Sequence, residues 1–244
     1  MKLKDFQFIG KTLYLEKPKI LVIGDLHLGY EYTFRESGSL IPATQFQDTK
    51  KDLELVFKEL KKQKKKIEKV IFLGDVKHFF AYNRGEKNLF LELLVLIGNH
   101  VKRDDIIVLK GNHEKMAEIA DKHLVDYYIE DGLAFIHGDK EYSEIFKNNI
   151  STIIMGHLHP AITLIDSQKI KKEKYKCFLI GKYKGKEAII LPSFLPTIEG
   201  TSINEYLREG SCIIPSKEIK KFNVYIVGEN NVFNFGKLNK LIID

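Results

Sequence analysis

The feature that most constrains this chain is one construction that occurs five times: a short apolar run, usually closed by Gly, followed by Asp, Asn or His. The apolar runs have the length and β-branched composition of buried strands. The polar residues that follow them are Asp25-Leu26-His27, Asp75, Asn112-His113-Glu114, His137-Gly138-Asp139 and His157-Leu158-His159. Ligands of an open α/β sheet bind just beyond the carboxyl ends of its strands. The five motifs therefore predict one metal site, with Asp75 at its centre.

The residue types in these motifs are metal donors. Carboxylate, amide and neutral imidazole groups together suit Mn, Fe, Zn, Co or Ni, and two ions about 3.5–4 Å apart can clamp both the attacking and the leaving oxygen of a phosphoryl displacement. A single Asp or Asn after a strand is more often a turn or helix cap, but the set is large enough for two ions with Asp75 bridging. The candidate donors are Asp25, His27, Asp75, Asn112, His137, His157 and His159. His100 and His123 belong to no motif, and we interpret them as structural.

Strands alternate with helices through the first two thirds of the chain, which favours an α/β fold. The pattern predicts a hairpin within residues 1–18, helices from Phe46 to Leu60 and over residues 86–97, a short helix over residues 115–123 and a helical turn within residues 141–148. Beyond residue 160 it predicts two hairpins. We expect residues 1–244 to form one domain, with the metal motifs in 24–159 and with 160–244 completing a second sheet.

The composition is that of a globular protein, with 44% apolar residues and a net charge of +6. Residues 58–69 (KELKKQKKKIEK) carry much of the positive charge, and they are either a solvated helix face or a phosphate-attracting patch. Cys177 and Cys212 lie far apart in sequence and are expected to be free, buried thiols. The sequence shows no apolar stretch long enough to span a bilayer and no signal-peptide core, so we expect a cytoplasmic protein without a membrane partner.

Together, Asp25-x-His27, Gly74-Asp75, Gly111-Asn112-His113-Glu114, His137-Gly138 and Gly156-His157-x-His159 resemble the calcineurin-like metallophosphoesterase superfamily. The resemblance implies a four-layer αββα sandwich of two mixed β-sheets, with a dinuclear metal site at the strand ends. It implies that Asp25, His27 and His159 hold one ion, that Asn112, His137 and His157 hold the other, and that Asp75 is shared. Manganese is the first expectation for both ions. A metal-bridging hydroxide would be the nucleophile, and His113 would protonate the leaving oxygen.

One departure from many phosphomonoesterases of the superfamily narrows the branch. Where those enzymes have Asp followed by Arg, three residues after the bridging Asp, this chain has His78. The Gly-Asp-x-x-His spacing is similar to that of the SbcD-related nucleases, a group that includes ligase- and helicase-associated DNA endonucleases. We therefore predict that His78 is the partner of the catalytic His113.

The function predicted from this resemblance is a divalent-metal phosphodiesterase, a nuclease that hydrolyses DNA or RNA, with a helicase or DNA-repair protein as an expected partner. The alternatives are a small-molecule phosphoesterase, acting on a cyclic nucleotide, a dinucleotide or a phosphomonoester, and a scaffold. The complete ligand set counts against a scaffold. Arg84 and Tyr30, with Tyr82, are weaker candidates for substrate binding. Residues 191–196 (LPSFLP) either shape substrate access or form a turn, and Glu114 is interpreted as favouring a helix N-terminus.

Overall fold

The computed structural model describes residues 5–31, 44–78, 84–114, 117–166, 168, 171–196, 199–229 and 231–243. In this part of the chain the first sheet has seven strands in the order β1-β2-β3-β4-β5-β7-β6. They are β1 (Phe6–Ile9), β2 (Thr12–Leu15), β3 (Ile20–Ile23), β4 (Lys69–Phe72), β5 (Ile106–Leu109), β6 (Glu118–Ile119) and β7 (Lys122–Val125). Strands β3, β4, β5 and β7 are parallel. Antiparallel β1, β2 and β6 flank them.

The second sheet has nine described strands, in the order β14-β11-β12-β13-β10-β9-β8 with β15 and β16 added beside β12. They are β8 (Tyr127–Glu130), β9 (Leu133–Ile136), β10 (Thr152–Met155), β11 (Pro160–Ile165), β12 (Lys172–Tyr183), β13 (Lys186–Ile190), β14 (Thr201–Ser202), β15 (Asn223–Val227) and β16 (Val232–Lys237). Strands β9, β10 and β13 are parallel to one another. The predicted hairpins in the last third of the chain are confirmed as β12–β13 and β15–β16.

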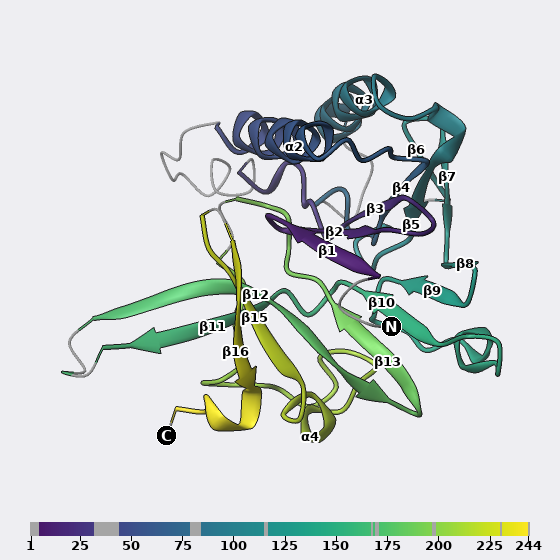
Figure 1. The fold of residues 1–244 in the computed structure, drawn as a ribbon. Helices are drawn as coiled ribbons and strands as arrows, with labels where there is room; N and C mark the ends of the chain where they lie inside the picture. Colours follow the sequence, from purple (N-terminus) through teal and green to yellow (C-terminus); the bar gives the residue numbers. More distant parts are fainter. Residues whose placement is uncertain are drawn as a thin grey trace.

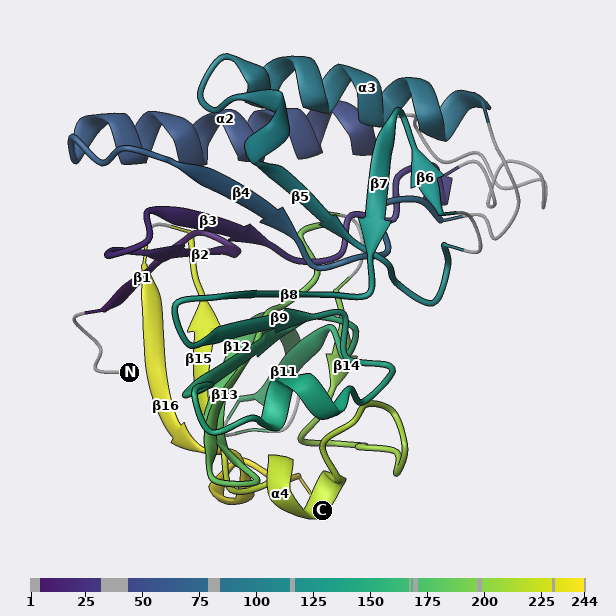
Figure 2. The same cartoon turned by 90° about the vertical axis from the view of Figure 1, so that its right-hand side faces the viewer.

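The elements stack in layers, as Figures 1 and 2 show. Helices α2 (Gln45–Lys62) and α3 (Arg84–Gly98) cover the outer face of the first sheet, and the second sheet lies against its inner face. The outer face of the second sheet is covered by loops and by η2 (Ser143–Phe146), α4 (Ser216–Ile219) and η3 (Leu238–Lys240). A further short helix, η1 (Arg103–Asp105), precedes β5. The predicted α/β sandwich of two mixed sheets is confirmed.

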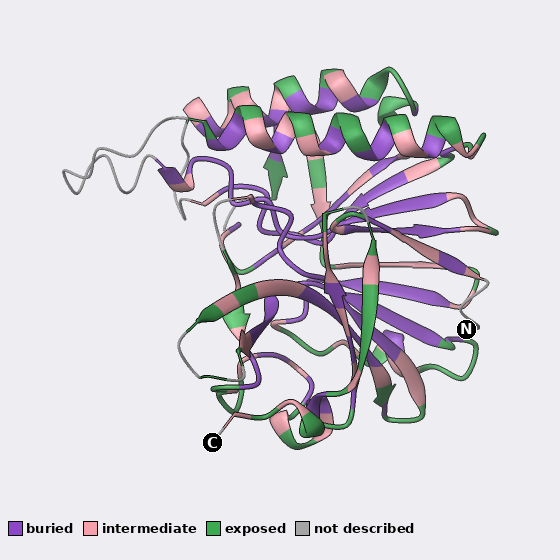
Figure 3. Cartoon of the chain, turned by 60° about the vertical axis from the view of Figure 1, so that its left-hand side comes forward, coloured by how far each residue is buried: buried purple, intermediate pink, exposed green. Residues whose placement is uncertain are grey.

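Strand alternation explains why both faces of each central strand are apolar. In β3, Leu21 and Ile23 pack toward the helices, while Ile20 and Val22 pack toward the second sheet. A strand covered on both faces reads as a continuous apolar run, as all the motif strands do. Figure 3 shows the corresponding pattern on α2 and α3, whose buried residues face the sheet and whose exposed residues face outward.

The helix predicted over residues 115–123 is wrong. The described part of this segment contains β6 and β7, which pair with each other across Ala120 and Asp121. Both of these residues have positive φ, as a tight hairpin turn requires. Strand β7 also pairs with β5 through Val108 and Leu124, so the sheet supplies the backbone hydrogen bonds that a helix would otherwise have formed.

Candidate metal centre

The five strand-end motifs converge between the two sheets. Asp25 and His27 follow β3, Asp75 follows β4 and Asn112 follows β5, whereas His137 follows β9 and both His157 and His159 follow β10. The donor atoms of Asp25, His27 and His159 form one group, and those of Asp75, His137 and His157 form a second, each within 4.8 Å of one another. The two sheets thus contribute to both groups.

In the first group, His27 Nε2 lies 3.3 Å from His159 Nε2, and His159 Nε2 lies 3.4 Å from Asp25 Oδ1. In the second, His137 Nε2 lies 3.0 Å from His157 Nδ1 and 3.1 Å from Asn112 Oδ1. Donor atoms bound at about 2.0–2.2 Å to a common ion are separated by about 3.0–3.5 Å. All four distances fall in this range.

Asp75 lies between the two groups. Its Oδ2 is 3.7 Å from His27 Nε2 and 3.4 Å from His137 Nε2, while its Oδ1 accepts a hydrogen bond from the main-chain N–H of His113 at 2.9 Å. One carboxylate oxygen therefore faces both donor groups, which is the position that a bridging ligand needs.

The tautomer of His137 supports a cation at this position. His137 Nδ1 lies 2.9 Å from the carbonyl oxygen of Leu73, so in the neutral ring Nδ1–H donates there and Nε2 presents a lone pair. That lone pair points at Asn112 Oδ1 and Asp75 Oδ2, which are also acceptors. A bound cation would satisfy all three, so the residues fit a divalent metal ion. The chemistry of the donor set does not distinguish among Mn, Fe, Zn, Co and Ni.

Without a cation, protons compensate for the crowded donors. Burial lowers the pKa of His137, but its hydrogen bond with Asp75 and the charges of Asp25 and Asp75 outweigh burial and raise that pKa to about 9. Burial raises the pKa of Asp25, yet the neighbouring imidazoles of His159, His137 and His27 hold it below its ordinary value. Burial and the charge of His159 lower the pKa of His27 to about 3.

The glycines of the motifs make room for ligands from other strands. A Cβ on Gly111 would lie 2.1 Å from Asp75 Oδ1, and a Cβ on Gly156 would lie 2.5 Å from Asp25 Oδ2. Side chains at these positions would displace the carboxylates. Strain is also stored in the ligand backbones, because four of the ligands have positive φ, a conformation uncommon for residues other than Gly. They are His27, Asp75, His157 and His159.

Glu114, which sequence reasoning placed at a helix N-terminus, instead fastens two ligand loops together. Its side chain is buried and accepts hydrogen bonds from the main-chain N–H groups of Asp75 (3.0 Å), Gly111 (2.8 Å) and Lys77 (3.2 Å). Burial and the charge of Asp75 raise the pKa of Glu114 to about 7. Its distance of two residues from Asn112 was the available sequence signal, but contacts with residues 75 and 77 depend on the tertiary fold.

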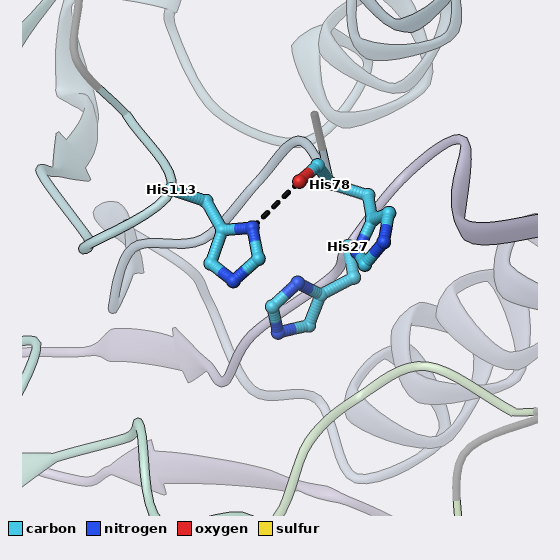
Figure 4. A group of neighbouring side chains, drawn as sticks. All are labelled: His27, His78 and His113. Atoms are coloured by element: carbon cyan, nitrogen blue, oxygen red, sulfur yellow. Dashed lines mark hydrogen bonds between the residues drawn. The ribbon is translucent and has the colours of Figure 1, made fainter. Parts of the chain in front are cut away.

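His113 lies beside Asp75 with one ring nitrogen already committed. His113 Nδ1 lies 2.6 Å from the main-chain carbonyl oxygen of His78, the contact drawn in Figure 4, so Nδ1–H donates and Nε2 remains available to the site. The predicted association of His78 with His113 thus includes a main-chain contact. The rings also lie close, with His78 5.4 Å and His27 5.0 Å from the ring of His113. Burial and the charge of His113 lower the pKa of His78.

Three further side chains that the sequence did not single out hold these loops. Glu86 is fully buried and accepts the main-chain N–H of His78 at 2.8 Å. Gln45 donates to the carbonyl oxygen of His27 at 3.1 Å. Lys176 donates to the carbonyl oxygen of Ser193 at 2.8 Å, and burial followed by the charge of Lys11 lowers its pKa to about 6. A polar residue in a mostly apolar helix or strand was the signal for each.

Residues 191–196 are buried and support a metal-ligand loop. The main-chain N–H of Phe194 donates to the carbonyl oxygen of Asp25 at 2.9 Å, and Ser193 Oγ donates to the same oxygen at 3.1 Å. Of the two interpretations left open by the sequence, the structure favours a turn that braces Asp25 over an exposed rim.

The weaker substrate-binding candidates differ in their positions. The ring of Tyr30 lies 4.8 Å from that of His78, at the edge of the histidine group, whereas Arg84 is exposed at the start of α3. Tyr82 lies outside the described residues. His100 stacks on Phe57. His123 is exposed near Glu118. Neither belongs to a donor group of the described residues.

The lysine-rich segment lies at the opposite end of the sheet from the donor groups. It spans the C-terminal turn of α2 and ends where β4 begins, whereas Asp75 follows the carboxyl end of β4. Several of its lysines are paired, including Lys65 with Glu16, Lys66 with Glu68 and Lys69 with Glu130. Cys177 and Cys212 are free and buried, as predicted.

Two mixed sheets that hold adjoining Asp, Asn and His donor groups at their strand ends define a class, the metal-dependent phosphoester hydrolases. The sequence profile of the calcineurin-like phosphoesterase family matches residues 18–228, and the chain belongs to this family. Its members use divalent metal ions. Among the described residues, no helix is both long enough and apolar enough to cross a bilayer.

Solved structures share the fold. Nuclease MPE of Pseudomonas putida is similar over 94% of this chain and 100% of its own length, with a TM-score of 0.62 and 18% identity. Vps29 of Entamoeba histolytica with bound Zn²⁺ has a TM-score of 0.38 and 14% identity over 88% of this chain and 96% of its own. A metallophosphoesterase of Sphaerobacter thermophilus has a TM-score of 0.34 and 10% identity over 89% and 88%. A search of curated protein sequences finds no match.

Proposed function

We propose that this protein is a divalent-metal-dependent phosphodiesterase whose substrate is DNA or RNA. Asp25, His27 and His159 would hold one ion, Asn112, His137 and His157 the other, and Asp75 both. When bound, the two ions would neutralise charge on the phosphoryl oxygens and lower the pKa of water. We propose manganese as the native metal.

The protein's own residues prepare the site for a proton transfer. The carbonyl oxygen of His78 fixes His113 by accepting its Nδ1–H, and the main-chain N–H of His113 is tied to Asp75. The protonated His113 can therefore present Nε2–H toward the site in a fixed orientation. We propose that it donates this proton to the leaving oxygen of the substrate, as a general acid.

The observation that carries the diester assignment is the group of imidazoles beside the donor atoms. The pKa values of His27 and His78 are both lowered, mainly by burial, so these rings are neutral near pH 7. Neutral rings offer a monoester dianion no fixed positive charge, whereas a diester carries one negative charge less. A second ester substituent also occupies space that a monoester leaves to an oxygen.

The nucleic-acid assignment is supported by fold similarity to a nuclease, MPE of Pseudomonas putida, and remains a proposal at 18% identity. A helicase or DNA-repair partner is likewise proposed. The lysine-rich segment, at the far end of the sheet, is not part of the proposed catalytic surface.

The direct test compares bis(4-nitrophenyl) phosphate with 4-nitrophenyl phosphate on Mn²⁺-reconstituted protein, since the two release the same leaving group. We expect a higher kcat/KM for the diester and then cleavage of single- or double-stranded DNA or RNA. A monoester preference of about tenfold or more would favour the small-molecule alternative over the diesterase.

A further inference from the structure

The segment from Thr201 to Ile213 joins two loops of the metal centre. The main-chain N–H of Thr201 donates to the carbonyl oxygen of His159 at 2.8 Å, and that of Ile213 donates to the carbonyl oxygen of Gly138 at 3.0 Å. One end is thus fastened to a ligand of the first donor group, and the other lies next to His137 of the second. Side chains between these two ends are positioned beside the metal centre.

A cavity of about 230 Å³ opens between this segment and the metal centre. It shares His157 with the second donor group. The remaining lining residues are Leu158, Thr201, Tyr206, Leu207, Arg208 and Ser211. A group bound in this cavity would touch a metal-ligand histidine, so it would be part of a molecule whose phosphate lies over the ions.

Tyr206 is an unusual residue to find in such a place, because it is 70% exposed while its backbone is firmly held. Its main-chain N–H donates to the carbonyl oxygen of Ser202 at 3.0 Å. Two residues earlier, buried Asn204 donates from Nδ2 to the carbonyl oxygens of Thr163 (2.9 Å) and Leu241 (3.0 Å) and accepts the N–H of Thr163. A rigid turn that keeps an aromatic ring in solvent is suited to stacking on a planar ligand.

Arg208 supplies a positive charge to the same cavity. It is exposed and forms no ion pair with a residue in the described ranges, while its carbonyl oxygen accepts Ser211 Oγ–H at 2.8 Å. A guanidinium group can bind a phosphate or stack on a base. Leu158 and Leu207 provide apolar walls, so the cavity combines the contacts that a nucleoside phosphate uses.

We propose that this cavity is a nucleoside subsite, in which Tyr206 stacks on one base of the substrate and Arg208 binds the adjoining phosphate or base. The proposal rests on the proposed phosphodiesterase function and specifies its substrate as a nucleotide diester. The volume is smaller than the roughly 300–1,000 Å³ of pockets for drug-sized ligands, which suits one base. A base enters it only when unstacked, so single-stranded or frayed nucleic acid is preferred.

The test uses two diesters with the same leaving group, the 4-nitrophenyl ester of thymidine 5′-monophosphate and methyl 4-nitrophenyl phosphate. Tyr206→Ala should raise KM for the thymidine ester about fivefold to a hundredfold, and leave KM for the methyl ester unchanged. Tyr206→Phe should retain the wild-type KM, because the ring is kept. Phe233→Ala, at another exposed aromatic residue, is the matched control and should change neither.

Equal changes with both esters, or none with either, would overturn the subsite while leaving the phosphodiesterase intact. If the wild type hydrolyses neither ester, the proposed function fails, and the subsite is then tested by calorimetric titration of Mn²⁺-loaded protein with thymidine 5′-monophosphate. Weaker binding to Tyr206→Ala but not to Tyr206→Phe supports the subsite. Equal binding by all three proteins excludes it.

Discussion

Glu114 allows a stability prediction whose magnitude comes from counted hydrogen bonds. Its carboxylate accepts the N–H groups of Asp75, Gly111 and Lys77 in a site that is 2% exposed. Each buried donor left without a partner costs about 1–3 kcal/mol. Glu114→Ala should therefore destabilise the metal-free protein by about 3–9 kcal/mol, which approaches the 5–15 kcal/mol that stabilises a typical domain.

Glu114→Gln should be milder. Its amide oxygen can take the place of Oε2, which accepts both Asp75 N–H and Gly111 N–H, but its NH₂ would then face the N–H of Lys77. The loss of one hydrogen bond costs about 1–3 kcal/mol. The ordering Ala > Gln is thus a consequence of which oxygen serves which donor.

The measurement is urea unfolding in the presence of a chelator at pH 8, above the pKa of Glu114 of about 7. Glu118→Gln, at a half-exposed carboxylate of β6, is the control and should change stability by less than about 0.5 kcal/mol. A loss below about 1 kcal/mol for Glu114→Ala, with an unchanged m-value, would show that the three donors find other partners.

Three further predictions concern the metals and the proton transfer. Asp75→Asn should abolish activity and weaken both ions by about a hundredfold or more, since even outer-shell changes cost 10–100-fold; two metals retained per chain after dialysis would exclude a bridging role. His113→Ala should keep the metals and reduce kcat by about a hundredfold on a poor leaving group, but less on nitrophenolate; equal losses on both would exclude a general acid. Below pH 9 the proton on His137 competes with the cation, because its pKa is raised to about 9 in the metal-free protein. Apparent Mn²⁺ affinity should therefore rise by up to about tenfold per pH unit between pH 7 and 9 in calorimetric titrations, and a flat profile would contradict this.

The sequence predicted the elements of the fold well where a strand or helix carries its own pattern. The motif strands β3, β4, β5, β9 and β10 are continuous apolar runs, and α2 shows buried residues at helical spacing. The segment that was predicted wrongly, residues 115–123, is short, and its state is decided by pairing of Leu124 with Val108 of a neighbouring strand. Short β8 and β14 were not predicted at all.

Within the metal centre, the sequence determined the identity of the candidate donors, because ligand chemistry is a property of residue type and the motifs lie directly after recognisable strands. Only the tertiary structure decided how they are grouped, and how they are supported. Glu114 and Lys176 are ordinary charged residues in sequence, yet one fastens the loops of Asp75 and Gly111 and the other braces the turn behind Asp25.

The same distinction applies to the proposed subsite. Nothing in the local sequence around Tyr206 and Arg208 marks a binding site, and these residues come beside His157 because Thr201 and Ile213 pair with the loops of His159 and Gly138. Which chemistry a chain can perform is written in residue types and short spacings. Which residues surround that chemistry depends on contacts between segments far apart in sequence, and these exist only once the two sheets have packed together.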